Sequence, residues 1–257
     1  MFRHAIVRPP APNFADGLTT VDLGRPDVAK ALAQHDAYCR ALEESGLALT
    51  RLPADPHFPD STFVEDTAVI TVRGSAILTR PGAPSRAGEA AAIEQTLLAR
   101  FPNLLRIEAP GTVDGGDIDE AGEHFFIGVS RRTNEEGARQ LARLLAADGY
   151  TSSLYDIRGV DEILHLKSGI AWLGEKTLVV IDALASHPAF AGWDLIRVPR
   201  GEEYAANCIL VDDSVFFAEG FPLLERALRE RGYRLTVLPM SEFQKMDGGL
   251  SCLSLRF

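Results

Sequence analysis

The residues with the clearest chemical potential lie near the C-terminus, in Met246-Asp-Gly-Gly-Leu-Ser-Cys252. A cysteine is either a small buried apolar residue or, as a thiolate, a nucleophile. Cys252 follows a Gly-Gly turn and is expected to open a strand, so we interpret it as a nucleophile presented at a site. Cys39 shares a helical stripe with His35, and Cys208 heads an apolar strand, so both are interpreted as core residues.

A histidine and a carboxylate supply two further groups for such chemistry. His165 stands in Leu164-His-Leu-Lys-Ser-Gly169, where a strand is expected to start after a loop. A general acid and base needs a pKa near neutrality and a partner that orients its ring. Asp114, in the turn Val113-Asp-Gly-Gly116, is the expected partner. The other five histidines are interpreted as surface or packing residues.

Carboxylates are concentrated in the same part of the sequence, with solvated loop acids as the alternative interpretation. These residues are Asp60, Glu65, Asp66, Asp114 and Asp117. Several anions around a channel of low dielectric repel one another and require a cation. A guanidinium fits best, because it is planar and pairs with carboxylates in a bidentate manner.

Two arginines stand where helices are expected to begin. Arg86 ends the segment Arg80-Pro-Gly-Ala-Pro-Ser-Arg86, and Arg132 precedes the segment Thr133-Asn-Glu-Glu136. A cation is disfavoured near the positive end of a helix, so these positions indicate capture of an anion such as the α-carboxylate of an amino acid. Surface solvation is the alternative for both arginines.

Composition limits the class of protein. The chain has 257 residues, 46% of them hydrophobic, and a formal net charge of -10. This charge argues against nucleic acid or an anionic membrane as a partner and favours a cationic small molecule. The N-terminal segment has no signal-peptide pattern, no apolar run reaches the length of a membrane span, and the three cysteines form no CxxC pair. We therefore expect a cytoplasmic protein.

The chain also repeats a pattern of two strands, a helix and a further strand. Unit junctions near Asp66, Asp117, His165, Asn207 and Gly248 are separated by 51, 48, 42 and 41 residues. Nearly constant spacing indicates a repeat architecture, and five units that close into a ring would bring every junction to one channel. A doubly wound sheet is the alternative.

The boundaries of the repeated elements follow from capping signals and apolar periodicity. The expected helices run from Asp27 to Ser45, from Ser85 to Phe101, from a capping box at Thr133–Glu136, from a short Ser186-His-Pro188 start, and from Pro222 to Arg231. A last strand, Ser251 to Phe257, is expected to pair beside the first strand and close the ring.

At these residues the chain resembles the dimethylarginine dimethylaminohydrolase family of the guanidino-group-modifying (pentein) superfamily. The resemblance runs from Val7 to the C-terminus. It is carried by Phe63-Val-Glu-Asp66, Thr79-Arg-Pro-Gly-Ala-Pro-Ser-Arg86, Asp114-Gly-Gly-Asp117, Arg131-Arg-Thr-Asn134, His165-Leu-Lys-Ser168, Ala205-Ala-Asn-Cys208 and Met246-Asp-Gly...Cys252. It implies an α/β fold, a five-bladed α/β propeller of ββαβ units around a central channel, and one catalytic domain over residues 1–257.

The resemblance also implies roles for individual residues. Cys252 would be the nucleophile, His165 the general acid and base, and Asp114 the residue that orients His165. The residues expected to bind substrate are Asp60, Glu65 and Asp66 on the guanidinium side, Arg86 and Arg132 at the carboxylate, and Leu18 with the backbone of Met246. Leu18 lies in the segment Asn13 to Thr20, which has no firm motif.

The implied activity is that of a dimethylargininase. The substrate would be a cationic amino acid, mono- or dimethylated arginine, hydrolysed to citrulline and methylamine or dimethylamine through a covalent thiouronium on Cys252. No metal or other cofactor is expected, because the sequence has no spacing typical of metal ligands. The sequence does not settle which methylated arginine is preferred, and a homodimer is one option for the oligomeric state.

Four alternatives to this activity can be named. Arginine and agmatine deiminases share the cysteine, histidine and acidic residues but usually carry an acid two positions after the histidine, where this chain has Lys167. Amidinotransferases are disfavoured for the same reason. A non-catalytic ring, as in the ribosome anti-association factor family, would not need Cys252, His165 and Asp114. A thiol-dependent acyl hydrolase would need an oxyanion hole rather than an excess of carboxylates.

Overall fold

The computed structural model describes residues 2–257 and contains five three-stranded sheets. The strands are β1 (His4–Val7), β2 (Ala48–Arg51), β3 (Ala68–Ile70), β4 (Ala76–Leu78), β5 (Leu105–Arg106), β6 (Ile118–Ala121), β7 (His124–Val129), β8 (Thr151–Asp156), β9 (Ile170–Trp172), β10 (Thr177–Val180), β11 (Asp194–Arg197), β12 (Ile209–Val211), β13 (Ser214–Ala218), β14 (Arg234–Leu238) and β15 (Ser254–Arg256). The α-helices are α1 (Val28–Glu44), α2 (Glu89–Leu98), α3 (Glu135–Ala147), α4 (Asp182–Ala185), α5 (Pro222–Glu230) and α6 (Ser241–Gln244).

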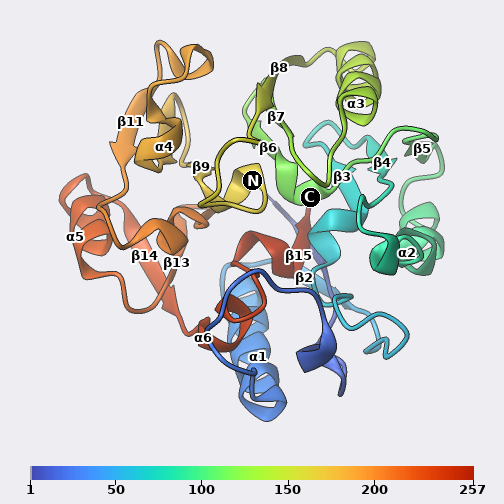
Figure 1. The fold of residues 1–257 in the computed structure, drawn as a ribbon, viewed down its shortest axis with the longest axis horizontal. Coiled ribbons are helices and arrows are strands. Elements are labelled where there is room, and N and C mark those ends of the chain that lie inside the picture. The colour runs from blue at the N-terminus through green and yellow to red at the C-terminus, as the bar shows by residue number, and fades with distance from the viewer. Residues whose placement is uncertain (1) are drawn as a thin grey trace.

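Each sheet joins an antiparallel pair to a third, parallel strand. In the third sheet, β6 pairs antiparallel with β7, and β7 pairs parallel with β8 after the chain has passed through α3. A parallel pair needs such a crossover connection, so the ββαβ unit follows from this pairing. Figure 1 shows the five units as the blades of a ring, with α1, α2, α3 and α5 towards its outside. The predicted five-bladed α/β propeller is therefore confirmed.

The two ends of the chain close the ring. Strand β15 pairs antiparallel with β1, with Ile6 opposite Leu255, and β1 pairs parallel with β2. The first sheet thus takes its inner strand from the C-terminus, as the sequence predicts. The pairing begins at Ser254, because residues Ser251–Leu253 form a 3-10 turn instead of the start of a strand.

Three helix starts differ from the prediction. Helix α2 begins at Glu89, because Pro84–Arg86 form a separate 3-10 turn with Pro84 at its first position. Helix α3 is capped by Asn134, whose side chain accepts from the Gly137 amide at 2.8 Å, and not by Thr133. The fourth helix is Asp182–Ala185, earlier than predicted, and Pro188–Phe190 form only a 3-10 turn.

The core consists of apolar side chains packed between neighbouring blades. Phe126 of β7 lies with its ring centroid 5.2 Å from Phe190 and 5.3 Å from Trp193 in the next blade. Such aromatic contacts between blades hold the ring together without a single central core. Within residues 2–257, no helix has the length and apolar character that would let it cross a membrane.

A short 3-10 turn precedes the inner strand of every sheet. These turns are η2 (Val64–Thr67), η4 (Gly115–Asp117), η5 (Leu166–Ser168), η7 (Glu203–Ala206) and η8 (Ser251–Leu253). Turn η2 contacts η8 and η4, and η5 contacts η4 and η7. Hydrogen bonds between Asn207 and Ser251 link the remaining neighbours. The five unit junctions therefore form one continuous layer at the centre of the ring.

The ring closure makes a testable contribution to stability. The Tyr38 hydroxyl on α1 is fully buried and lies 2.6 Å from Ser254 Oγ on β15. Tyr38→Phe removes this bond, while Ser254 keeps its bond from Arg256. We expect the free energy of unfolding in urea to fall by about 1 kcal/mol, the usual net value of one buried hydrogen bond. Tyr233→Phe is the matched control and should leave it unchanged. Equal stability of both variants would contradict this role for Tyr38.

Candidate active site

His165 and Asp114 meet at the centre of the ring. His165 precedes η5, Asp114 precedes η4, and His165 Nε2 lies 3.0 Å from Asp114 Oδ2. Both side chains are buried. The other Asp114 oxygen accepts from the Gly82 amide at 2.8 Å, and the Asp114 amide donates to Thr133 Oγ1 at 3.0 Å. Asp114 is therefore fixed from two sides and can hold the imidazole in one orientation.

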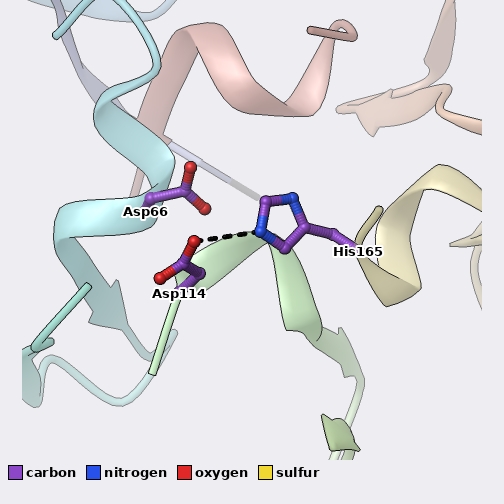
Figure 2. Close-up of side chains that lie close together, drawn as sticks. All are labelled: Asp66, Asp114 and His165. Atoms are coloured by element: carbon purple, nitrogen blue, oxygen red, sulfur yellow. Dashed lines mark hydrogen bonds and ion pairs between the residues drawn. The ribbon is translucent and has the colours of Figure 1, made fainter. Parts of the chain in front are cut away.

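Asp66 from η2 completes a cluster with this pair. Figure 2 shows its carboxylate beside the imidazole of His165 and the carboxylate of Asp114. Its Oδ1 accepts from the Gly116 amide at 2.8 Å, and its Oδ2 pairs with the Arg86 guanidinium. Burial would raise the pKa of Asp66, but Arg86 and His165 outweigh burial and lower it to about 2. Asp66 is therefore an anion at neutral pH.

Arg86 lies beside Asp66 and is only 4% exposed. Its Nε and one terminal nitrogen donate to Glu89 at 2.6–3.1 Å, and the other terminal nitrogen pairs with Asp66. Carbonyl oxygens of Asp60 and Phe63 accept further bonds. The structure thus places Arg86 as a buried counterion in the 3-10 turn Pro84–Arg86, and not as an anion-binding residue at the start of α2.

The carboxylates around His165 make it a cation. Burial disfavours the charged imidazole, but Asp66, Asp117 and Asp114 together raise the pKa of His165 to about 9. Asp117 is itself held between η4 and η5, with bonds from Ser130 Oγ at 2.6 Å and the Leu166 amide at 3.1 Å. His165 can therefore donate a proton at neutral pH, as a general acid must.

Cys252 lies in η8, the turn next to η2, and not on a strand as the sequence predicts. Its side chain is partly exposed, and its Sγ accepts from the Gly249 amide at 3.4 Å. Burial and the carboxylates of Glu65 and Asp66 raise the pKa of the thiol to about 12. The thiol is therefore protonated when no cation lies beside it.

Glu65 precedes Asp66 but has different partners. Its Oε1 accepts from Lys167 Nζ at 2.7 Å and lies 3.6 Å from the Arg256 guanidinium. Its Oε2 accepts from Ser251 Oγ at 2.7 Å. Lys167, the residue that departs from the deiminase pattern, thus joins η5 to η2 across the channel. The charge of Glu65 is already balanced by two cations.

Asp60, Leu18 and Met246 come together at the edge of the site. The Leu18 amide donates to both Asp60 oxygens, at 3.0 and 3.2 Å. A β-carbon on Gly17 would lie 2.4 Å from Asp60 Oδ1 and 3.2 Å from Met246 Cε, so a larger residue there would displace these side chains. Burial raises the pKa of Asp60. Leu18 itself is 40% exposed, whereas Met246 is buried.

The segment after Leu18 is tied to the segment that leads to Cys252. Thr19 Oγ1 donates to the Lys245 carbonyl at 2.9 Å, and the Thr20 amide donates to Asp247 Oδ2 at 2.6 Å. Two chain segments far apart in the sequence therefore cover this side of the channel together.

Arg132 is more exposed than Arg86 and lies next to Asp114. Its side chain is 15% exposed, and one terminal nitrogen lies 3.7 Å from Asp114 Oδ2. Asp66, Asp114 and His165 each offer an atom within 4.8 Å of the others, a spacing that could hold a metal ion. Arg86 and Arg132 already supply positive charge to the two carboxylates. The donor set therefore has protein cations where a metal would otherwise balance the charge.

Three residues that shape the site are not among those predicted from the sequence. Glu89 binds Arg86, Thr133 binds the Asp114 amide, and Ser251 connects Glu65 to the Cys252 turn. The i,i+3 spacing of Arg86 and Glu89 was a usable signal, because these positions face each other on a helix. Thr133 was assigned to a helix cap. Nothing in the sequence marks Ser251, whose bond spans 186 residues.

Comparisons with known proteins place this arrangement in context. The chain is 47% identical over 258 residues to the N(G),N(G)-dimethylarginine dimethylaminohydrolase of Pseudomonas aeruginosa, with 100% of both chains covered. It is 33% identical to the protein of the same name from Streptomyces coelicolor over 260 residues, which cover 99% of this chain and 96% of that one. No family model matches the sequence.

Solved structures agree with these relatives. A cysteine-to-serine mutant of the Pseudomonas aeruginosa enzyme complexed with citrulline superimposes with a TM-score of 0.96, at 47% identity and with 100% of both chains covered. The N-terminal domain of ArgZ, a cyanobacterial arginine dihydrolase, superimposes with a TM-score of 0.88 at 18% identity, over 100% of this chain and 97% of that one. The second likeness shows the shared fold alone.

The charge state of His165 gives a prediction for pH. Since its pKa is about 9 in the fold against an ordinary 6.5, the stability it contributes is full below pH 6.5 and is lost as pH rises through 9. In an NMR titration we expect the His165 imidazole to titrate near 9, and Asp114→Asn to lower that pKa, because the variant removes a hydrogen-bonded anion.

His124 is the internal control for this titration. Its imidazole bonds to Thr151, far from the cluster, and burial lowers its pKa. Asp114→Asn should leave the His124 titration unchanged. A His165 titration near 6.5 in the unmodified protein would show that the carboxylates do not hold the proton.

Proposed function

This chain belongs to the dimethylarginine dimethylaminohydrolase family, and we propose that it hydrolyses Nω-methylated arginines to citrulline and methylamine or dimethylamine. The observation that carries the proposal is the cationic His165, bonded to Asp114 and flanked by the anionic Asp66, in the layer that also holds Cys252. A thiol, a proton donor and fixed anions are the groups that displacement of an amine from a guanidinium carbon needs.

The substrate guanidinium would bind on the acidic side of this layer. Asp60 and Asp66 supply the negative charge, and a planar cation matches carboxylates well. Glu65, which the resemblance also implies on this side, instead pairs with Lys167 and Arg256 and lines a cavity on the other side of the layer.

Arg132 is proposed to bind the α-carboxylate, because its side chain lies beside Asp114 and is 15% exposed, whereas that of Arg86 is 4% exposed. Arg86 contributes by fixing Asp66 and the carbonyl oxygen of Asp60. This is a change of role for Arg86 from direct contact to positioning.

The remaining contacts come from the two segments that cover the channel. Leu18 is proposed to pack on the substrate, since its amide is fixed by Asp60 while its side chain stays exposed. The backbone of Met246 would also contact the substrate. On the guanidinium side, the room near Asp60, Glu65 and Phe63 would decide between mono- and dimethylated arginine.

The first chemical step forms a bond between sulfur and carbon. A bound guanidinium places positive charge beside Cys252 and lowers the pKa of the thiol, so its proton leaves to solvent. The thiolate adds to the guanidinium carbon, and His165 gives its proton to the amine nitrogen. The carbon–nitrogen bond then breaks, neutral methylamine or dimethylamine departs, and a thiouronium remains on Cys252.

The second step restores the enzyme. His165, now neutral but still bonded to Asp114, takes a proton from a water molecule, and the resulting hydroxide adds to the thiouronium carbon. The carbon–sulfur bond breaks, the hydroxyl of the intermediate loses its proton as citrulline forms, and a proton returns from solvent to the departing sulfur, so Cys252 is again a thiol. His165 holds the proton for the next turnover. Asp114 keeps the imidazole in one orientation through both steps.

We further propose that residues 1–257 act as a single catalytic domain in the cytoplasm. The support is that Cys39, Cys208 and Cys252 are all free, which fits a reducing compartment. Proton transfer and nucleophilic attack by the chain's own residues account for every step above, so the proposed mechanism includes no metal or other cofactor.

The proposed function is tested with four substrates. Purified protein is incubated with asymmetric dimethylarginine, monomethylarginine, arginine and agmatine, and ureido product and released amine are quantified. We expect citrulline with methylamine or dimethylamine from the methylated arginines and little product from the others. Ammonia from arginine or agmatine would show a deiminase instead, and no product from any substrate would contradict hydrolysis of guanidino groups.

The role of Cys252 is tested by substitution. Cys252→Ser should lower kcat by about 10³-fold or more, because a hydroxyl in this acidic environment is a far weaker nucleophile. Circular dichroism should show an unchanged fold. Cys39→Ala is the matched control, since it removes a thiol on α1 that is fully buried. It should keep its activity. Substantial turnover by Cys252→Ser would rule out Cys252 as nucleophile.

A further inference from the structure

The channel contains a cavity behind the layer of unit junctions. It has a volume of about 530 Å³, and its walls are residues of the five inner strands. Aliphatic wall residues include Ala68, Ile70, Ile118, Ala171, Ile209 and Leu255. Glu65, Lys167 and Ser251 line one end, whereas the hairpin-turn residues Val72, Gly122 and Asp212 line the other. The cavity therefore lies between the catalytic layer and the hairpin turns.

The cavity has more acidic than basic side chains. Its acids are Glu65, Asp119, Glu120 and Asp212, and its bases are Lys167 and Arg256. Both bases are already engaged, because Lys167 Nζ lies 2.7 Å and Arg256 3.6 Å from the same carboxylate, Glu65. The acids on the walls and at the hairpin end therefore exceed the positive charge available to them.

Asp119 is the group that points to a ligand. It stands on β6, its side chain lines the cavity, and the residue is only 7% exposed. Its Oδ2 is buried and has no hydrogen-bond partner among the described residues. A buried carboxylate oxygen without a donor costs free energy, and native proteins pair nearly all such groups. A cationic donor in the cavity would supply the missing partner.

We propose that this cavity is a binding site for an organic ammonium ion with an apolar body, held by Asp119. The ammonium group would bind near Asp119, with Glu120 on the next residue of β6 adding negative charge. The apolar body would lie along the aliphatic strand residues. An anion would face uncompensated carboxylates, and a neutral molecule of the same shape would leave Asp119 without a charged partner.

The site is separate from the catalytic centre but shares residues with its support. Ser251 donates to Glu65 on the cavity side, and its Oγ lies 4.0 Å from Cys252 Sγ. Glu65 and Asp66 are consecutive in η2, the first lining the cavity and the second bonded to Arg86. A molecule bound in the cavity would therefore contact Glu65 and Ser251, whose neighbours in the sequence are Asp66 and Cys252.

The test uses phenethylammonium and its neutral analogue 2-phenylethanol, titrated into the full chain at about pH 8. Burial raises the pKa of Asp119 to about 6, so the carboxylate is ionised under these conditions. Binding is measured by calorimetry and by the fluorescence of Trp172, which lines the cavity. We expect phenethylammonium to bind about tenfold more tightly than 2-phenylethanol, which corresponds to one charge-assisted hydrogen bond.

Three variants locate the site. Asp119→Asn keeps the shape of the side chain and should weaken phenethylammonium about tenfold, without changing the affinity for 2-phenylethanol. Asp213→Asn is the matched control, because Asp213 pairs with Arg234 on the surface and is not a wall residue. It should bind as the unmodified protein does. Trp172→Phe should remove the fluorescence signal and leave the calorimetric signal.

A further variant decides the matter if Asp119→Asn does not fold. Val72 is 61% exposed at the hairpin end, and only its backbone bonds to Glu120, so Val72→Lys should fold and repel an ammonium ion. Weaker phenethylammonium binding by Val72→Lys supports the site. The proposal is overturned if the unmodified protein does not bind phenethylammonium, binds it no better than 2-phenylethanol, or binds it equally after Asp119→Asn or Val72→Lys.

Discussion

The ion pairs of the buried Arg86 guanidinium with Asp66 and Glu89 are the interaction on which the site depends. Each of these charges alone would be costly in the interior, and together they are stable only because the guanidinium meets two carboxylates in good geometry. Arg86 thereby keeps Asp66 ionised beside His165. Burial raises the pKa of Glu89 to about 7, although Arg86 opposes this. Its three bonds from Arg86 hold Glu89 as the second partner of the buried guanidinium. The protonation states of Asp66 and His165 therefore depend on Arg86 and Glu89, which are both buried.

The 3-10 turns give this layer two distinct faces. With about three residues per turn, successive side chains point in directions about 120° apart. Glu65 therefore faces Lys167 and the far cavity, while Asp66 faces His165. Ser251 and Cys252 of η8 also point in different directions. The Ser251 side chain bonds to Glu65 and Asn207. The repeated 3-10 turn therefore separates the catalytic side of the layer from the side that faces the cavity.

Much of the fold was predictable because it follows from local signals. The spacing of the junctions gave five units, and Asp27 at the start and Gly46 after the end bounded the first helix. The 3-10 turns were not predictable, since three or four residues carry no measurable periodicity. The identity of the key chemical residues followed from their types and from the family resemblance. The bonding partners of these residues did not, because Arg86 and Asp66 are 20 residues apart and other acids, such as Glu65 and Glu89, lie close to one or the other in the sequence. The acid that pairs with the Arg86 guanidinium is determined by which carboxylates are buried beside it. That burial arises only when the ring of blades has closed.

The same carboxylates that attract a cationic substrate also suppress the nucleophile in its absence. Burial, Glu65 and Asp66 raise the pKa of Cys252 to about 12, while His165 with a pKa of about 9 already holds its proton. The empty site therefore contains a proton donor and an unreactive thiol. In the proposed mechanism a guanidinium reverses this balance, because it brings its positive charge to the position where the thiolate would otherwise be unstable. A neutral amide or urea of similar shape brings no such charge, so it meets a thiol. The enzyme then selects for a cation both when it binds substrate and when the Cys252 thiol loses its proton. The same carboxylates provide both forms of selectivity.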